Sequence, residues 1–376
     1  MALGLVLVLA GTSWRYPVLA TVGLILLTLV GTDVLAVLRA PAMLVRRTVE
    51  PQVVLRGGAC RGTLQVSGVR SGPLTAAIDI YDRVADELVA IPFAARSRAG
   101  VATLSYAIPT RRRGLMAVGP AQVHRRGVAG MAMTVEELGE HDVVRVLPQQ
   151  VPLAGMVIGH RRAVTGGDDS AEQGGTDLIG LHEYTMGEDL RRLHWATSAR
   201  TGTLMVREDS EPSQAHVVVL LDDRASSYGE GDRDHELFEE AVELAAAMCR
   251  VSIESGNPLR FQSVSDNYDM LVPGSATRQP RRESRELDWL LAEVPLTDAA
   301  STPTVGTRDL DIAVAITGPT ADLAQLAVSV AQARTRIVAV LDPSAHVRMS
   351  HEFDSLVIRE RSALELARVW DAGVRK

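Results

Sequence analysis

The sequence is poor in aromatic residues and contains only two cysteines among its 376 residues. Phe, Trp and Tyr make up 4% of the chain, so hydrophobic cores must be built mainly from Val, Leu, Ala and Ile. Cys60 and Cys249 belong to no CxxC pair, which argues against a disulfide scaffold and fits a reducing compartment. A basic surplus is also missing, because the net charge is −7, and we therefore expect no nucleic-acid partner.

Known catalytic motifs are missing as well. The sequence contains no HExxH, no GxSxG and no Walker A motif, and the pair His235-Glu236 lacks the second histidine of a zincin. The nine histidines do not cluster at the spacing of metal ligands. These absences predict a protein that is not an enzyme and that needs no cofactor.

Apolar residues are concentrated near the N-terminus. Residues 17–38, PVLATVGLILLTLVGTDVLAVL, carry one charge and form a run of about 20 residues, enough to cross a bilayer. A shorter apolar run, residues 2–11, precedes it, and Trp14 and Tyr16 lie between the two as interfacial anchors. Residues 1–40 are therefore predicted to form a transmembrane helical hairpin whose first helix is short.

Charges around the longer run predict its orientation. Arg39, Arg46, Arg47 and Arg56 follow it, so the positive-inside rule places the protein in the cell (inner) membrane with its soluble domains facing the cytoplasm. No basic n-region supports a signal peptide instead. Asp33, near the end of the run, is expected to lie at the interface or to pair with a neighbouring arginine.

The rest of the chain divides into three parts. Residues 41–150 show period-2 patterning with Gly and Pro turns, which predicts a small antiparallel β-sandwich or barrel. Residues 151–214 hold a Gly- and Asp-rich linker followed by a charge-dense segment. In residues 215–376 strands alternate with helices, one of them expected over residues 320–334, which predicts a doubly wound α/β domain with a mainly parallel sheet.

The first strand of that domain, AHVVVLLDD, ends in Asp222-Asp223, at the sheet edge where such folds bind ligands. The next residues resemble the Asp-x-Ser-x-Ser start of the metal-ion-dependent adhesion site in von Willebrand factor A domains, where one Asp and two hydroxyls share a divalent cation. Asp222 and Ser226 fit this pattern, but Arg224 stands where the first serine belongs. We expect a degenerate, metal-free site in which Arg224 takes the position of the ion by pairing with Asp222 or Asp223. Mg²⁺ at Asp222 and Ser226 is the alternative.

The segment YTMGEDLRRLHWATSAR, residues 184–200, admits three interpretations. A catalytic site would use His194 as its base, but the segment offers no nucleophile. An anion or partner site would use the guanidinium groups of the three arginines. In a structural lock the arginines would pair with nearby carboxylates, with Trp195 packed beneath them. If the indole ring is fully buried, Trp195→Ala would then lower stability by about 3–5 kcal/mol. We expect the lock, formed by Asp189, Arg192, Trp195 and Arg200.

The longer run that contains this segment, residues 178–208, is similar to the hallmark of the bacterial domain-of-unknown-function family 58. His182 departs from the pattern, because many relatives carry an arginine just before Glu-Tyr. The matching residues are Glu183, Tyr184, Gly187, Glu188, Asp189, Arg191, Arg192, Trp195, Ala199, Arg200, Leu204, Val206 and Glu208.

This resemblance extends over the whole chain and implies two membrane spans, a β-rich region with a PTRRRG-like segment (residues 109–114) and a von Willebrand factor A-like domain. Genes of the family are commonly found beside a MoxR-type AAA+ ATPase and transglutaminase-like membrane proteins. The resemblance therefore implies a membrane-anchored interaction or assembly protein that docks such an ATPase or its client. The alternative is a metal- or anion-dependent hydrolase acting on envelope material, with Asp222, Ser226 and His194 near one cleft.

Overall fold

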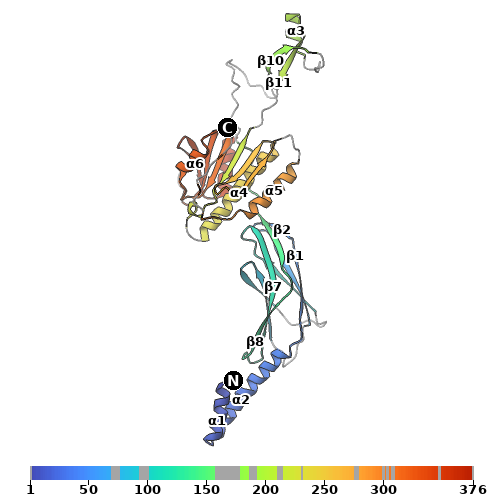
Figure 1. Ribbon diagram of the computed structural model, residues 1–376, viewed down its shortest axis with the longest axis vertical. Coiled ribbons are helices and arrows are strands. Elements are labelled where there is room, and N and C mark those ends of the chain that lie inside the picture. Colours follow the sequence, from blue (N-terminus) through green and yellow to red (C-terminus); the bar gives the residue numbers. More distant parts are fainter. Residues whose placement is uncertain are drawn as a thin grey trace. The chain divides into compact units, whose positions relative to one another are not determined.

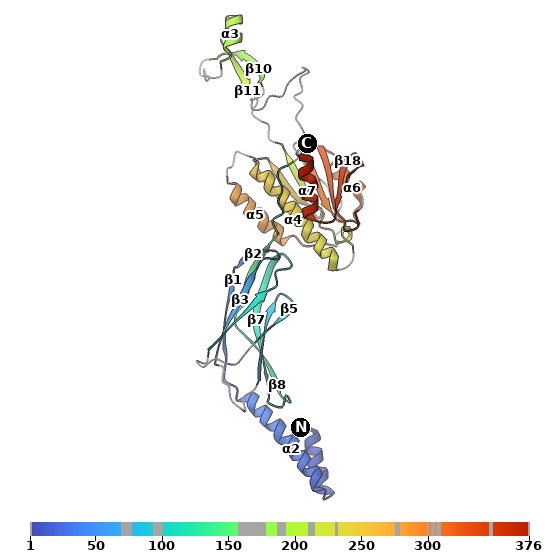
Figure 2. The same cartoon turned by 180° about the vertical axis from the view of Figure 1, so that it is seen from behind.

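The computed structural model describes residues 2–68, 77–92, 101–156, 178–185, 193–209, 215–229, 232–274, 279–298, 301, 305, 310–345 and 349–374. The chain divides into two compact units. The first comprises Met1–Gln150 with Asp288–Pro295, and the second comprises Val151–Leu287 with Leu296–Lys376. Figures 1 and 2 show the elements of both units from opposite sides.

The first unit begins with two helices that pack along each other, α1 (Ala2–Ser13) and α2 (Pro17–Leu38) (Figure 1). Pro17 is suited to the first turn of α2, where its missing N–H removes no helical hydrogen bond. Among the described helices, only α2 is long and apolar enough to cross a membrane, whereas α1 has 12 residues. The predicted pairing of a short first helix with a longer second one is present, and of these two helices α2 alone has the length of a membrane span.

Two β-sheets follow in the same unit. A three-stranded antiparallel sheet has the order β1-β3-β6, and a second sheet has the order β2-β9-β7-β4-β5, with β8 paired to β7. All pairs are antiparallel except β2 with β9. The strands are β1 (Leu44–Glu50), β2 (Val53–Leu55), β3 (Cys60–Ser67), β4 (Ala77–Val84), β5 (Glu87–Ile91), β6 (Val101–Ile108), β7 (Gly114–Arg126), β8 (Met133–Leu138) and β9 (Asp142–Leu147).

Alternating burial along the strands builds one core between these sheets. In β3 every second residue is buried, so Leu64 and Val66 point inward while their neighbours face outward. They belong to one cluster with Ile80, Val118 and Val144 of the other sheet. The structure therefore confirms antiparallel β-structure over residues 41–150 and gives it the form of a sandwich.

A buried polar cluster links the two sheets of the sandwich. Arg47 of β1 donates from Nε and Nη2 to the two carboxylate oxygens of Asp82 of β4, at 2.9 and 2.6 Å. The hydroxyl of Tyr106 in β6 donates to the same carboxylate. Burial, and then the hydrogen bond to Asp82, raise the pKa of Tyr106, so its hydroxyl keeps the proton that it donates. The Asp82 charge is thus fully paired inside an apolar core.

In the second unit, a small antiparallel pair carries the family-like segment. Strand β10 (Leu178–Glu183) pairs with β11 (Met205–Asp209), and helix α3 (Trp195–Thr201) contacts β11. The helix covers seven residues and ends at Gly202, which adopts a left-handed conformation as C-cap.

The larger part of the second unit is a seven-stranded sheet of order β14-β13-β12-β15-β16-β18-β17. The five inner strands are parallel, and both edge strands are antiparallel to their neighbours. The prediction of a mainly parallel sheet is confirmed. Its strands are β12 (Val217–Leu221), β13 (Leu259–Ser263), β14 (Asp269–Val272), β15 (Leu310–Thr317), β16 (Ala333–Leu341), β17 (Met349–Glu352) and β18 (Ser355–Glu360).

Helices cover both faces of this sheet. Val218, Leu220 and Ala315 belong to one cluster with Leu326 of α6 (Leu323–Ser329). Because successive strand residues point to opposite faces, Val219 and its alternates face the other side, where α4 contacts four of the inner strands. Figure 2 shows α4 (Asp232–Glu254), α5 (Pro280–Glu293) and α7 (Ala363–Val374) on that side.

Helix α6 is shorter than predicted. It begins after Asp322, whose carboxylate accepts from the backbone N–H groups of Ala324 and Gln325, and it ends at Ser329. The helix was predicted over residues 320–334, which is too long at the C-terminal side. Ala333 already pairs with Leu310 as the first residue of β16. Sheet pairing overrides the helical pattern there.

The cluster in the sandwich yields a stability prediction. Asp82→Leu should lower the free energy of unfolding by about 3–5 kcal/mol, because it removes the carboxylate that accepts two hydrogen bonds from the buried guanidinium of Arg47. The matched control is Asp79→Leu, which removes the partner of Arg126 from an exposed ion pair and should cost at most about 1 kcal/mol. Chemical denaturation in detergent measures both. Equal losses in the two variants would contradict the assignment.

Candidate functional site

The site lies where β12 ends in the centre of the seven-stranded sheet. All five residues of β12 are buried, and the strand is paired on one side with β13 and on the other with β15. Since the chain runs from β12 first to β13 and later to β15, the sheet order reverses at this edge. Asp222 and Asp223 follow β12 directly and are buried. Such a reversal point is where open α/β sheets hold their ligands.

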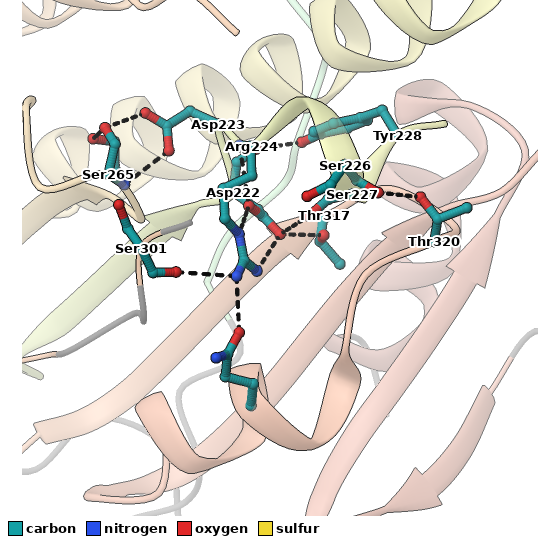
Figure 3. A network of polar contacts seen from close by, with 12 residues as sticks. Asp222, Asp223, Arg224, Ser226, Ser227, Tyr228, Ser265, Ser301, Thr317 and Thr320 are labelled. Carbon is teal, nitrogen blue, oxygen red and sulfur yellow. Dashed lines mark hydrogen bonds and ion pairs between the residues drawn. The ribbon is translucent and has the colours of Figure 1, made fainter. Parts of the chain in front are cut away.

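The carboxylate of Asp222 accepts five hydrogen bonds (Figure 3). Its Oδ1 accepts from Nε of Arg224 at 2.8 Å and from the Arg224 backbone N–H at 3.2 Å. Its Oδ2 accepts from Nη2 of Arg224 at 2.9 Å and from the hydroxyls of Ser227 and Thr317 at 2.6 and 2.8 Å. Both oxygens are therefore occupied by protein donors.

The rest of the Arg224 guanidinium is held by the surrounding chain. Its Nη1 donates to the backbone oxygen of Ser301 at 3.2 Å and to Oε1 of Gln325 in α6 at 2.8 Å. The hydrogen bonds to Asp222 raise the pKa of Arg224, so the buried side chain stays charged. A fixed protein cation thus neutralises Asp222.

This donor set does not fit a divalent cation. Mg²⁺ and Ca²⁺ need oxygen ligands with free lone pairs, whereas Arg224 directs N–H groups onto both oxygens of Asp222. Within the described part of the chain, no group of three or more His, Cys, Asp or Glu side chains is placed to hold a metal ion. The expectation that Arg224 pairs with Asp222 is confirmed.

Ser226, the other residue of the predicted metal pattern, does not supply a hydroxyl to Asp222. Residues Ala225–Ser227 form one turn of 3₁₀-helix, which brings Ser227 back over Asp222 and leaves Ser226 exposed. The backbone oxygen of Ser226 accepts from the hydroxyl of Thr320 at 2.7 Å. The serine hydroxyl that bonds to Asp222 is therefore that of Ser227, one residue after Ser226.

Neighbouring contacts hold the turn in place. Asp223 accepts from the backbone N–H and the hydroxyl of Ser265 after β13, and the hydroxyl of Tyr228 donates to the backbone oxygen of Asp222 at 2.6 Å. Gly318, after β15, lets the turn approach, because a Cβ there would stand 2.4 Å from the backbone oxygen of Ser227. Among the described residues, the side chains at this strand end are joined in one polar network.

The family-like segment is described in part. Glu183 ends β10, and the backbone N–H of Tyr184 donates to the backbone oxygen of Leu204 at 2.7 Å. Trp195, Ala199 and Arg200 lie exposed on α3. Gly187, Glu188, Asp189, Arg191, Arg192 and the side chain of Glu208 lie outside the described residues.

The prediction of a buried Trp195 was wrong, because its side chain is 68% exposed. Helix α3 begins at Trp195, with His194 as N-cap whose Nδ1 accepts from the backbone N–H of Thr197 at 3.2 Å. The buried residue of the helix is Ser198, which donates to His194 and accepts from Met205. A start at Trp195 turns the indole outward, so the predicted lock does not hold at this residue and the loss expected for a buried ring does not apply.

Residues 181–341 match the family described as "Protein of unknown function DUF58". This match supports the DUF58 family for residues 181–341. The match runs from β10 to the end of β16 and so includes α3 and the network around Asp222. The resemblance found in the hallmark residues is confirmed.

Two further comparisons do not establish a fold. The comparison with curated proteins gave no match. Among solved structures, a cohesin module from the family 33 glycoside hydrolase of Clostridium perfringens ATCC13124 aligns with 28% of this chain and 98% of its own, at 12% identity and a TM-score of 0.15. That score is too low to show a shared fold.

The DUF58 network yields a prediction about metals. Arg224→Ser restores a hydroxyl at the position of the first serine. It should lower the free energy of unfolding by about 3–5 kcal/mol, because Asp222 loses its buried partner. Mn²⁺ or Mg²⁺ should then raise the melting temperature of Arg224→Ser, and less so that of Arg224→Ala, which lacks the hydroxyl. The parent protein should respond to neither the cations nor EDTA. Metal-dependent melting of the parent would contradict this assignment.

Proposed function

We propose that this DUF58 protein is a membrane-anchored, non-enzymatic interaction protein. In this proposal α2 holds the chain in the cell membrane, with its soluble parts in the cytoplasm. The second unit, taken as a von Willebrand factor A-like domain, and the α3 segment present the docking surface. A MoxR-type AAA+ ATPase or its client is the expected partner, and a transglutaminase-like membrane protein is the expected companion.

The exposed indole of Trp195 carries this proposal. Exposed large aromatic groups mark contact surfaces, and Trp and Arg contribute most often to the binding energy of protein interfaces. Arg200 lies exposed in the last turn of the same short helix. The helix is held on β11, since His194 donates its backbone N–H to Met205 at 2.8 Å and Ser198 accepts from Met205. A side chain presented from a fixed helix loses little further entropy on binding.

The network at Asp222 supports a role that needs no metal. In von Willebrand factor A domains the divalent cation lies at the equivalent strand end, and here Arg224 supplies the positive charge instead. Docking at this edge would therefore be independent of Mg²⁺, unlike docking through a metal-ion-dependent adhesion site.

The hydrolase alternative finds no comparable support. A metal-dependent hydrolase would need Asp222 to hold the ion, but five hydrogen bonds occupy its carboxylate. His194, the candidate base, uses Nδ1 in the cap of α3.

Binding of the purified MoxR-type AAA+ ATPase of the same organism to the full chain in lipid nanodiscs tests the proposal. The parent should bind in EDTA as it does in Mg²⁺, with a non-hydrolysable nucleotide kept on the ATPase. Trp195→Ala should weaken binding at least about tenfold, the loss of one interface hot spot. Its free energy of unfolding should fall by less than about 1 kcal/mol, because the ring is exposed.

Trp289→Ala provides the matched control, because Trp289 is a second exposed tryptophan, in α5. It should leave the affinity unchanged. A parent that does not bind the ATPase, or a Trp195→Ala variant that binds as tightly as the parent, would overturn the proposal.

A further inference from the structure

A hairpin of the sandwich is fastened to α2 by a buried carboxylate. Asp33 of α2 is fully buried and accepts from the backbone N–H groups of Ala129 and Met131, at 2.8 and 2.7 Å. These two residues belong to the turn between β7 and β8. We name residues 127–133 the hairpin tip. The partners of Asp33 are thus backbone N–H groups of this turn and not the arginine that was one of the two expectations.

The fit between the two segments is close. A Cβ at Gly127 would stand 2.3 Å from Cγ of Asp33, so only glycine allows this approach. The turn is closed by its own bonds, because the N–H of Gly127 donates to Ala132 at 2.8 Å and the N–H of Gly130 donates to Gly127 at 3.0 Å. The hairpin tip is therefore held at the level of Asp33 along α2.

That level lies inside the apolar run. Asp33 precedes Leu38, the last residue of α2, by five positions, which corresponds to about 7–8 Å at the helical rise of 1.5 Å per residue. The 22 residues of α2 span about 33 Å, close to the thickness of a bilayer's hydrocarbon core. With α2 across the membrane, the hairpin tip lies at the boundary between lipid headgroups and acyl chains.

The side chains of the tip suit that boundary. Val128, Met131 and Met133 are 60%, 49% and 57% exposed, which is costly in water for adjacent apolar groups. Arg39, after the last residue of α2, and Arg46 are exposed nearby in the sequence, where cations attract anionic lipid. The hairpin tip thus offers exposed apolar groups, and exposed cations follow α2 in the sequence.

A cavity of about 570 Å³ lies between α2 and the hairpin tip. Its lining includes Leu29 and Leu35 of α2, Met43 and Ile78 of the sandwich, and Val128 of the tip. Arg39 and Arg125 also line it. An apolar cavity with cationic groups at this depth has the chemistry to take part of a phospholipid.

We propose that the hairpin tip is a second membrane contact, which inserts into the interfacial layer of a phospholipid bilayer beside α2. The inference rests on the membrane anchoring by α2 proposed above. Val128, Met131 and Met133 enter the acyl-chain boundary, and Asp33 sets their depth. The sandwich is then fixed to the bilayer at two points and cannot swing about the end of α2.

Depth-dependent fluorescence quenching tests this inference on the full chain in vesicles of phosphatidylethanolamine and phosphatidylglycerol. Cys60 and Cys249 are both buried, so one introduced cysteine can carry a nitrobenzoxadiazole label. The three sites are Met133, Ile25 in the middle of α2, and Leu115, an exposed residue about 40 Å along β7 from the tip at the strand rise of 3.3 Å. Lipids carry a nitroxide either near the headgroup or deep in the chain.

The label in Met133→Cys should show blue-shifted emission and stronger quenching by the shallow nitroxide than by the deep one. Ile25→Cys should show the reverse order, and Leu115→Cys should be quenched by neither. Quenching at Ile25 without quenching at Met133 would overturn the inference and leave the anchor intact. A lack of quenching at both sites would overturn the anchoring itself, and with it the inference.

Discussion

The ion pair between Arg224 and Asp222 is the constraint on which the carboxyl edge of the seven-stranded sheet depends. A carboxylate without solvent contact must be neutralised, and here the cation comes from two residues further along the chain. The guanidinium also donates hydrogen bonds to Ser301 and Gln325. The Arg224 side chain therefore joins the carboxyl end of β12 to the first turn of α6. The site at the sheet's reversal point is thereby closed, and its charge does not depend on an ion from solution.

The same physical rule recurs at two further buried carboxylates. Asp82 is paired with Arg47 across the sandwich, and Asp33 is satisfied by backbone N–H groups of the hairpin tip. Each carboxylate joins elements that are far apart in the sequence. A buried carboxylate is stable only when donors satisfy its oxygens, and these donors come from distant segments. In both places, at α2 and at the end of β12, a buried carboxylate joins separate segments by accepting hydrogen bonds from protein groups.

Periodicity in the sequence predicted the hairpin, the β-structure and the mainly parallel sheet, since apolar spacing reports directly on which face of an element is buried. It also predicted the pairing of Arg224 with Asp222, which are neighbours in sequence. Three features could not be obtained in this way. Ser227 rather than Ser226 reaches Asp222 because of a 3₁₀ turn, Trp195 points outward because α3 starts there, and the partners of Asp33 lie in a distant turn. Each depends on tertiary geometry that spacing does not encode.

The guanidinium of Arg224 binds both carboxylate oxygens of Asp222 and thereby blocks them as ligands of a metal ion. The most direct test is a crystal structure of the protein grown with millimolar Mn²⁺, with anomalous scattering recorded at the manganese edge. The account predicts continuous guanidinium density against both oxygens of Asp222 and no anomalous peak there. A manganese peak on Asp222, with Arg224 turned away from the carboxylate, would contradict it.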